Sequence, residues 1–150
     1  PKSRLWDGQV PEGFYRIEGF NPASRFHLSM RIGYPNAWDR SRSRGVPLGG
    51  DIMIHGNCVS IGCLAMTDEG IQELWVLAEP VRKAGGTIFV HIFPQRDVAT
   101  LVAREKDPAL ALFWRGLADG LARFDRDRVV RTPRNEDGLY VFIPKPVRAP

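Results

Sequence analysis

The chain has 150 residues, enough for about one domain with its own hydrophobic core. Hydrophobic residues make up 43% and charged residues 25% of it, a balance typical of folded globular proteins that argues against intrinsic disorder. No apolar run approaches the roughly 18 residues of a transmembrane helix, so we do not expect an integral membrane protein. The chain does not begin with a signal-like segment either.

The net charge is +4, and arginines gather between Arg40 and Arg44 and again between Arg123 and Arg134. Acidic residues such as Asp125 and Asp127 interrupt the second cluster, as on a solvated helix face and unlike a stripe that follows phosphates. We therefore do not expect nucleic acid as a partner. A mildly basic surface suits an anionic cell-wall polymer or a membrane surface equally well.

The first half of the chain predicts strands joined by a long loop. Residues 1–13 carry no periodicity, and we expect a loosely held lead-in. Residues 14–20 and 26–32 alternate as strands do, and the segment Asn-Pro-Ala-Ser at 21–24 is a turn signal between them. The segment 33–50 is rich in Gly, Pro, Asn, Ser and Arg and predicts a long functional loop.

The middle of the chain predicts a strand, a helix and another strand. Residues 51–55 form a short buried strand, and Thr67 caps a helix whose first turn is acidic and whose apolar residues recur on one face. Pro80 is expected to kink or end that helix, and two glycines at 85–86 prevent any helix from continuing past them. Residues 87–93 form the most strand-like run.

In the last third, apolar residues recur at helical spacing over 108–126, and a final strand is expected at 139–143. The proline-rich end, 144–150, is expected to be loosely held. The whole pattern predicts one mixed α/β (α+β) domain with two packed helices.

The segment Gly50–Asp68 carries the chemistry. A short strand ends in His55, and a Ser-Ile-Gly-Cys turn places Cys63 eight residues later. A cysteine nucleophile needs a partner that removes its proton and then protonates the leaving group, and histidine does both near neutral pH. Gly62 allows a sharp turn whose N–H groups can point at a developing oxyanion. The segment therefore predicts a thiol acyl-transfer site.

The strand-HG…S-x-G-C pattern resembles the L,D-transpeptidase (YkuD-like) catalytic domain, and in particular its YafK-type murein branch. The resemblance extends over most of the chain. A bare S-x-G-C is weak evidence, but its combination with GYPNAWD upstream and IHG at the right distance is specific. The motifs that carry the resemblance are PEGFYRI (11–17), NPASRFHLSMRIGYPNAWDR (21–40), the active-site block, HIFP (91–94) and FWRGLADGLARF (113–124).

The resemblance implies Cys63 as the nucleophile, His55 as the base and Gly62 as the turn. It also implies that the backbone carbonyl of Gly56 orients the imidazole, so a carboxylate third member is not expected. The sequence departs from the commoner pattern at Ile61, where many relatives have histidine, and in the short spacing from His55 to Cys63. Leu64-Ala65-Met66 also replaces the polar residue that often follows the nucleophile.

For the whole domain, the resemblance implies a β-sandwich-like core and acyl transfer on peptidoglycan stem peptides without a cofactor. It further implies a bacterial periplasmic or cell-envelope location and acylation of the cysteine by carbapenem-type β-lactams. Within the YafK-like branch it implies work on the linkage between murein and a covalently attached lipoprotein, including its cleavage. Transpeptidation that makes 3–3 cross-links is the near alternative.

Several further residues have two interpretations each. The Ser60 hydroxyl either stabilises the turn locally or contacts substrate. The loop residues Tyr34, Asn36, Trp38 and Asp39 either line a substrate groove or belong to a self-packed loop with the tryptophan as its plug. His91 lies in an apolar strand, where a structural role is favoured over proximity to the site.

Two other classes of function compete with the enzyme. A metal site from His55, Cys58, Cys63 and His91 is disfavoured, because the H-x2-C-x4-C spacing does not match the common zinc knuckles. A non-catalytic cell-wall-binding module is disfavoured by the intact histidine, glycine and cysteine. For Cys58 we favour a small buried hydrophobe over a disulfide with Cys63, which would consume the nucleophile.

Overall fold

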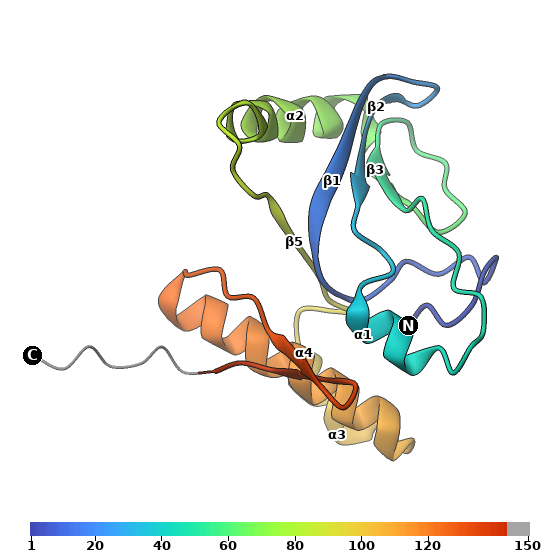
Figure 1. The fold of residues 1–150 in the computed structure, drawn as a ribbon, viewed down its shortest axis with the longest axis vertical. Coiled ribbons are helices and arrows are strands. Elements are labelled where there is room, and N and C mark those ends of the chain that lie inside the picture. The colour runs from blue at the N-terminus through green and yellow to red at the C-terminus, as the bar shows by residue number, and fades with distance from the viewer. Residues whose placement is uncertain (144–150) are drawn as a thin grey trace, which may run out of the picture. The chain divides into compact units, whose positions relative to one another are not determined.

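A computed structural model describes residues 1–143, and their internal contacts group the chain into two units. The N-terminal unit is Pro1–Ile92, and the C-terminal unit begins at Phe93 (Figure 1). The proposed loose end at 144–150 lies outside the described residues. The architecture is mixed α/β, as the sequence predicted.

A five-stranded sheet organises the N-terminal unit, in the strand order β4-β3-β2-β1-β5. Neighbouring strands are antiparallel except β3 and β4, which are parallel. The sheet therefore brings together β3 and β4, two strands separated only by the loop 56–63. The strands are β1 (Gly13–Ser24), β2 (His27–Ile32), β3 (Met53–His55), β4 (Leu64–Ala65) and β5 (Phe89–Ile92).

The turn between β1 and β2 is later in the chain than predicted. Asn21 pairs with Ser29 and Ser24 pairs with His27, so β1 continues through the predicted turn at 21–24 and the chain reverses at 25–26. The turn-forming residues instead lie in β1, where the pairing register shifts between Asn21 and Ser24. The Asn21 side chain accepts the N–H of Ala23 at 3.0 Å.

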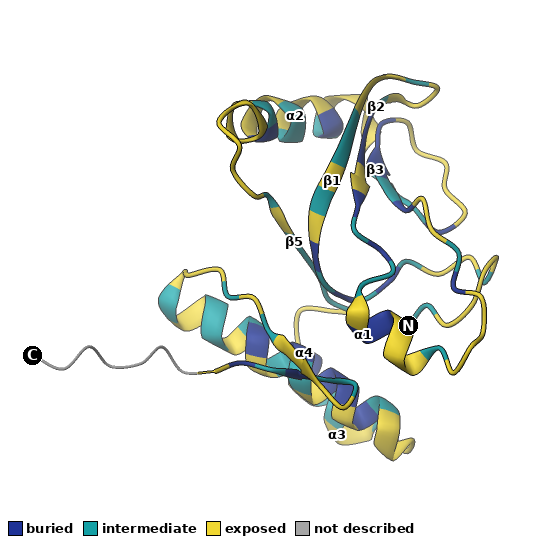
Figure 2. Cartoon of the chain, in the orientation of Figure 1, coloured by how far each residue is buried: buried dark blue, intermediate teal, exposed yellow. Residues whose placement is uncertain are grey.

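Helix α2 (Thr67–Lys83) covers one face of the sheet and contributes the fully buried Ile71 to its core. The core beneath it includes Met30 and Ile54 from the middle strands, and Figure 2 shows α2 with both buried and exposed residues. Of the two outcomes predicted for Pro80, it does not end the helix, since α2 continues three residues beyond it. The hydrogen bond that proline removes lies on the carbonyl of Val76, an exposed residue that water can reach.

A six-residue helix, α1 (Ala37–Arg42), lies inside the predicted loop. Asn36 and Asp39 form a reciprocal capping box, in which each side chain accepts a backbone N–H of the other. The sequence prediction missed this helix because six residues are too few to display a period.

The first residues of the chain are held in place, unlike the loose lead-in that we expected. The Asp7 carboxylate accepts from Lys2 Nζ at 2.8 Å and from the N–H of Ser3 at 2.7 Å. The N–H of Leu5 donates to the carbonyl of Pro47 at 2.8 Å. Side-chain and backbone bonds therefore fix the segment without regular secondary structure.

In the C-terminal unit, α4 (Pro108–Asp127) packs against α3 (Val98–Arg104) and against a two-stranded hairpin. The hairpin consists of β6 (Arg134–Glu136) and β7 (Leu139–Val141). The predicted helix at 108–126 and the final strand are confirmed, whereas α3 and β6 were not predicted. Asp107 caps α4 by accepting the N–H groups of the first turn. The buried residues of this unit include Val98, Phe113, Trp114, Leu117 and Tyr140.

Within the described residues, no helix is both long and apolar enough to span a bilayer.

We expect Ile71→Ala to lower the free energy of unfolding by about 2–5 kcal/mol, because it opens a cavity beneath α2 where the side chain is 0% exposed. Val76→Ala on the same helix is the control, since Val76 is 70% exposed and its truncation should cost at most about 0.5 kcal/mol. Urea unfolding followed by circular dichroism measures both. Equal losses for the two variants would contradict the observed packing of α2.

Candidate active site

His55 lies at the end of β3 and is 3% exposed. Its Nδ1 atom is 2.6 Å from the carbonyl oxygen of Gly56. Because a carbonyl can only accept, the proton of the neutral ring is on Nδ1 and the lone pair is on Nε2. This tautomer suits a general base, and the bond to Gly56 is the one that the family resemblance implied.

The imidazole is also held by ring packing. The Phe26 ring, from the reversal between β1 and β2, lies 4.8 Å from the His55 ring, centroid to centroid. Ser29 of β2 is the strand partner of His55 in β3 and is itself buried. Packing and the Gly56 bond together restrict both the tilt and the rotation of the base.

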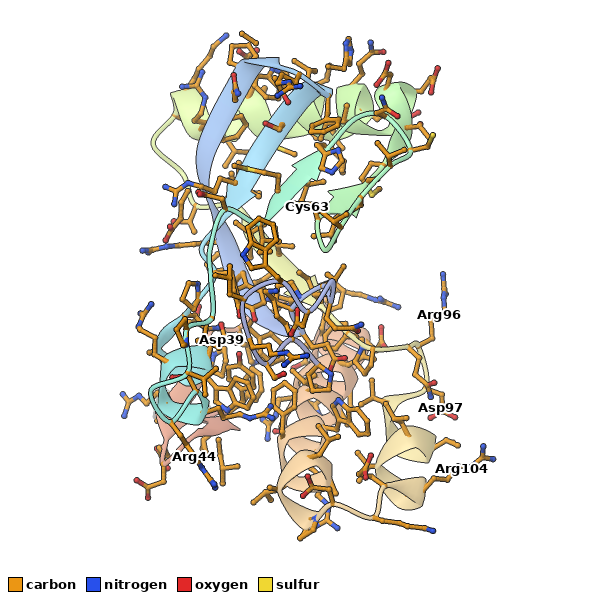
Figure 3. The ribbon with its side chains drawn as sticks, turned by 90° about the vertical axis from the view of Figure 1, so that its right-hand side faces the viewer. Asp39, Arg44, Cys63, Arg96, Asp97 and Arg104 are labelled. Atoms are coloured by element: carbon orange, nitrogen blue, oxygen red, sulfur yellow. The ribbon has the colours of Figure 1, made fainter. Side chains whose placement is uncertain are left out.

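Cys63 immediately precedes β4 and is partly exposed. Its Sγ accepts from the N–H of Met53 at 3.4 Å and lies 3.8 Å from the carbonyl oxygen of Asp51. The thiol therefore lies beside Met53, the first residue of β3, just before the first residue of β4 that pairs with β3. Figure 3 shows Cys63 beside these short strands.

The parallel pairing of β3 with β4 brings His55, the last residue of β3, near Cys63, which immediately precedes β4. His55 pairs with Ala65, two residues after Cys63, so the two side chains are diagonal neighbours across the strand pair. No hydrogen bond joins them in the part of the chain that the structure describes. Catalytic hydrogen bonds are often long before substrate binds, so the resting arrangement is compatible with proton transfer.

The hydroxyl of Ser60 holds the turn before Cys63. Its Oγ accepts the N–H of Cys63 at 2.7 Å and of Gly62 at 3.2 Å, and it donates to the carbonyl of Cys63 at 2.8 Å. Of the two interpretations of Ser60, the local one describes the resting structure. The N–H groups expected to face an oxyanion are therefore engaged by Ser60 in that state.

Gly62 has φ +114°, a conformation that favours glycine. A Cβ there would also lie 3.2 Å from the carbonyl oxygen of Gln9, so the N-terminal segment packs against the turn. Ile61, in the position where many relatives have histidine, is 79% exposed and points away from the core.

Cys58 is exposed, and the interpretation of a buried hydrophobe is wrong. It lies on the loop between β3 and β4, where Asn57 with φ +63° turns the chain outward and accepts the N–H of Cys58 on its side chain at 2.6 Å. Neither Cys58 nor Cys63 forms a disulfide.

Comparison with known proteins places the chain in a family. Residues 2–103 match the family model "L,D-transpeptidase catalytic domain", known as YkuD. The chain belongs to the L,D-transpeptidase family. The matched region includes the whole sheet and α2, and with them His55 and Cys63.

Two curated relatives are 37% identical to the chain over 150 residues, 98% of its length. Both are named "Putative L,D-transpeptidase YafK", one from Escherichia coli K12 and one from Escherichia coli O157:H7. The chain spans 59% of the length of these relatives.

Two solved structures of the helical cell shape determining protein Pgp2 from Campylobacter jejuni are more distant. One is 16% identical with a TM-score of 0.48, covering 91% of this chain and 60% of that one. The other, a K307A mutant, is 21% identical with a TM-score of 0.49, covering 83% and 44%.

The loop residues that we considered for a substrate groove are largely buried in this L,D-transpeptidase domain. The side chains of Tyr34, Trp38 and Asp39 are 3–6% exposed. The Asn36 amide donates to the carbonyl of Phe14 at 3.3 Å, and Figure 3 shows Asp39 on α1, well separated from Cys63. Their contacts fit the alternative interpretation, a self-packed loop in which Trp38 is the plug.

His91 lies on β5, at the edge of the sheet opposite β4. Three strand spacings, about 14 Å, separate β5 from β3. Its ring packs edge-on against Phe14 at 4.8 Å, and burial lowers the pKa of His91. The structural interpretation of His91 fits this position.

The Asp39 carboxyl is a buried acid with a shifted pKa. Burial raises the pKa of Asp39 to about 6. The N–H of Asn36 at 2.8 Å, the hydroxyl of Tyr15 at 3.2 Å and the charges of Arg42 and Arg40 act in the opposite direction. Desolvation outweighs these four contributions.

Three groups at the site were not predicted from the sequence: the N–H of Met53, the ring of Phe26 and the carboxylate of Asp68. The first is a backbone group, for which no residue type is a signal. Asp68 was interpreted only as an acidic residue favourable to the helix dipole, yet its Oδ1 accepts the N–H of Asn57 at 2.8 Å. No cluster of three or more metal-binding side chains occurs among residues 1–143.

The raised pKa of Asp39 predicts that the stability of the folded chain depends on pH. Between about pH 4 and pH 6 the folded chain keeps a proton on Asp39 that the unfolded chain releases, so the free energy of unfolding falls as the pH rises through this window. The loss expected from this group is about 2–3 kcal/mol.

Asp39→Asn should remove that loss, because the amide stays neutral at every pH and keeps an oxygen for the N–H of Asn36. Urea unfolding at pH 4 and pH 7 measures it, and Glu69→Gln at an exposed position of α2 should leave the loss in place. A difference between wild type and Asp39→Asn that does not change with pH would contradict the buried-carboxyl explanation.

Proposed function

We propose that this domain catalyses cysteine-dependent acyl transfer on peptidoglycan stem peptides. The observation that carries the proposal is a histidine in a defined tautomer on β3, with a thiol that immediately precedes the neighbouring strand β4. Membership of the L,D-transpeptidase family supports the same chemistry and the same polymer. The curated relatives are longer than this chain, so the proposal concerns the domain.

In the first half-reaction, His55 Nε2 takes the proton of the Cys63 thiol, and Sγ attacks the carbonyl carbon at the L-centre of the stem peptide. The C–N bond then breaks, the imidazolium gives its proton to the leaving amine, and a thioester remains on Cys63. In the second half-reaction an amine or water attacks the thioester. His55 accepts its proton, the C–S bond breaks, and the thiol is restored.

The contacts of Sγ support a thiolate at this position. The N–H of Met53 donates to Sγ and becomes a stronger partner when the sulfur is negative, whereas the carbonyl of Asp51 accepts only from the protonated thiol. On deprotonation Sγ therefore loses the carbonyl of Asp51 as a partner and keeps the N–H of Met53.

We assign the oxyanion to the N–H groups of Gly62 and Cys63. In the resting state both donate to Ser60 Oγ, so the serine hydroxyl must rotate away or share them when the tetrahedral intermediate forms. Ser60 thus satisfies these donors in the absence of substrate.

The acyl acceptor distinguishes two versions of the function. We favour cleavage or exchange of the linkage between murein and an attached lipoprotein, because Leu64 and Ala65 replace the polar residue common after the nucleophile. The relatives named YafK support this branch. Cross-linking of stem peptides is the alternative, and both versions place the enzyme in the bacterial periplasm or cell envelope.

Cys63→Ala should abolish turnover of muropeptides, measured by mass spectrometry, since it removes the thiol that forms the thioester. Cys58→Ser is the matched control and should retain activity, because Cys58 is an exposed loop thiol. A carbapenem should add its mass to wild type and Cys58→Ser but not to Cys63→Ala.

Wild-type turnover by Cys63→Ala would exclude the mechanism. Failure of every form to react with either muropeptides or the drug would favour a non-catalytic cell-wall-binding module.

The fate of the acyl-enzyme can be measured with two substrates. Lysine-bearing stem peptides, which represent the lipoprotein linkage, should release lysine when water or another amine resolves the thioester. Purified monomeric muropeptides should not form 3–3 cross-links in quantity. Abundant new cross-links without lysine release would overturn our preference and establish the cross-linking alternative.

A further inference from the structure

We propose that Asp68 is a positioning residue that acts on His55 through the peptide group between Gly56 and Asn57. Asp68 Oδ1 accepts the N–H of Asn57 at 2.8 Å. The carbonyl of Gly56 accepts Nδ1–H of His55 at 2.6 Å. These two bonds belong to the two ends of one peptide unit.

Because the peptide unit is planar, its N–H and C=O are fixed in opposite directions. A carboxylate on the N–H therefore sets the direction in which the carbonyl points. Its negative charge also polarises the amide and makes the carbonyl oxygen a stronger acceptor, since hydrogen bonds in a chain strengthen one another. Asp68, the peptide group and His55 form such a chain.

The peptide unit has little room to move. A Cβ on Gly56 would lie 2.5 Å from Asp68 Oδ1 and 2.7 Å from the carbonyl oxygen of Phe26. The N–H of Gly56 donates to the carbonyl of Leu28 at 3.1 Å. Glycine is therefore required at this position if the carboxylate and the peptide group are to meet.

The start of α2 holds the same turn from its other side. The N–H of Met66 donates to the carbonyl of His55 at 2.9 Å, and the N–H of Thr67 donates to the carbonyl of Asn57 at 3.0 Å. With Asp68, three consecutive residues bind the turn that follows the base. Asp68 is the only one of the three that does so through its side chain.

The chain of bonds does the work that a carboxylate does when it contacts a catalytic histidine directly. It fixes the tautomer and stabilises the imidazolium that forms when the thiol is deprotonated. Asp68 is exposed, so solvent screens its charge, and we expect an effect near the lower end of the range for supporting residues, about tenfold.

The test compares Asp68→Ala and Asp68→Asn with wild type and with the control Glu69→Ala, an exposed acidic residue one position along α2. The first readout is the proton resonance of His55 Nδ1–H in NMR spectra. It should move upfield in Asp68→Ala, and less in Asp68→Asn, which keeps an acceptor oxygen without the charge. Glu69→Ala should leave it unchanged.

The second readout is the kinetics on muropeptides, which rests on the proposed function. Asp68→Ala should lower kcat about tenfold with KM unchanged, and Asp68→Asn should lie between it and wild type. If Asp68→Ala does not fold, Asp68→Asn alone decides.

An Nδ1–H resonance that stays at its wild-type position in the Asp68 variants would overturn the inference whatever the activity. If the resonance moves while wild type itself never turns over muropeptides, the hydrogen-bond chain stands and the proposed function fails.

Discussion

The three residues of β3 are hydrogen-bonded on both sides, antiparallel to β2 and parallel to β4, and every group of the site is placed relative to them. The last residue of the strand is His55, the proposed base, and its first residue, Met53, donates a backbone N–H to the thiol of Cys63. A strand this short has little stability alone, so its neighbours fix its position. A shift of the register by one residue would turn His55 to the face that α2 covers.

The parallel β3–β4 pair explains how a loop of only eight residues, 56–63, can bring a cysteine back beside the strand that ends in His55. Parallel strands usually need a long crossover. Here the second strand is only Leu64–Ala65, and its pairing begins just after Cys63, so the loop needs only to reverse and return alongside β3. Asn57 and Gly62, both with positive φ, make the two bends, and the Ser60 hydroxyl binds the backbone before the nucleophile.

The sequence predicted the elements that are long or strongly patterned and missed those that depend on a few local bonds. Helix α4 has twenty residues and a clear apolar face, so its period was visible. Helix α1 is fixed by a capping box, and α3 has only seven residues. Pro80 does not end α2, because a missing hydrogen bond on an exposed turn costs little when the rest of the helix is packed.

Residue types and spacing alone were enough to select His55 and Cys63 as the proposed base and nucleophile, because few side chains can perform this chemistry and the glycine turn restricts where they occur. The same information could not predict which groups surround His55 and Cys63. The exposure of Cys58 depends on how the loop between β3 and β4 packs, and the bond from the N–H of Asn57 to Asp68 joins two residues that belong to separate elements. Such contacts exist only once α2 has packed against the sheet, because the carboxylate and the turn it binds belong to separate elements that nothing in their local sequence brings together.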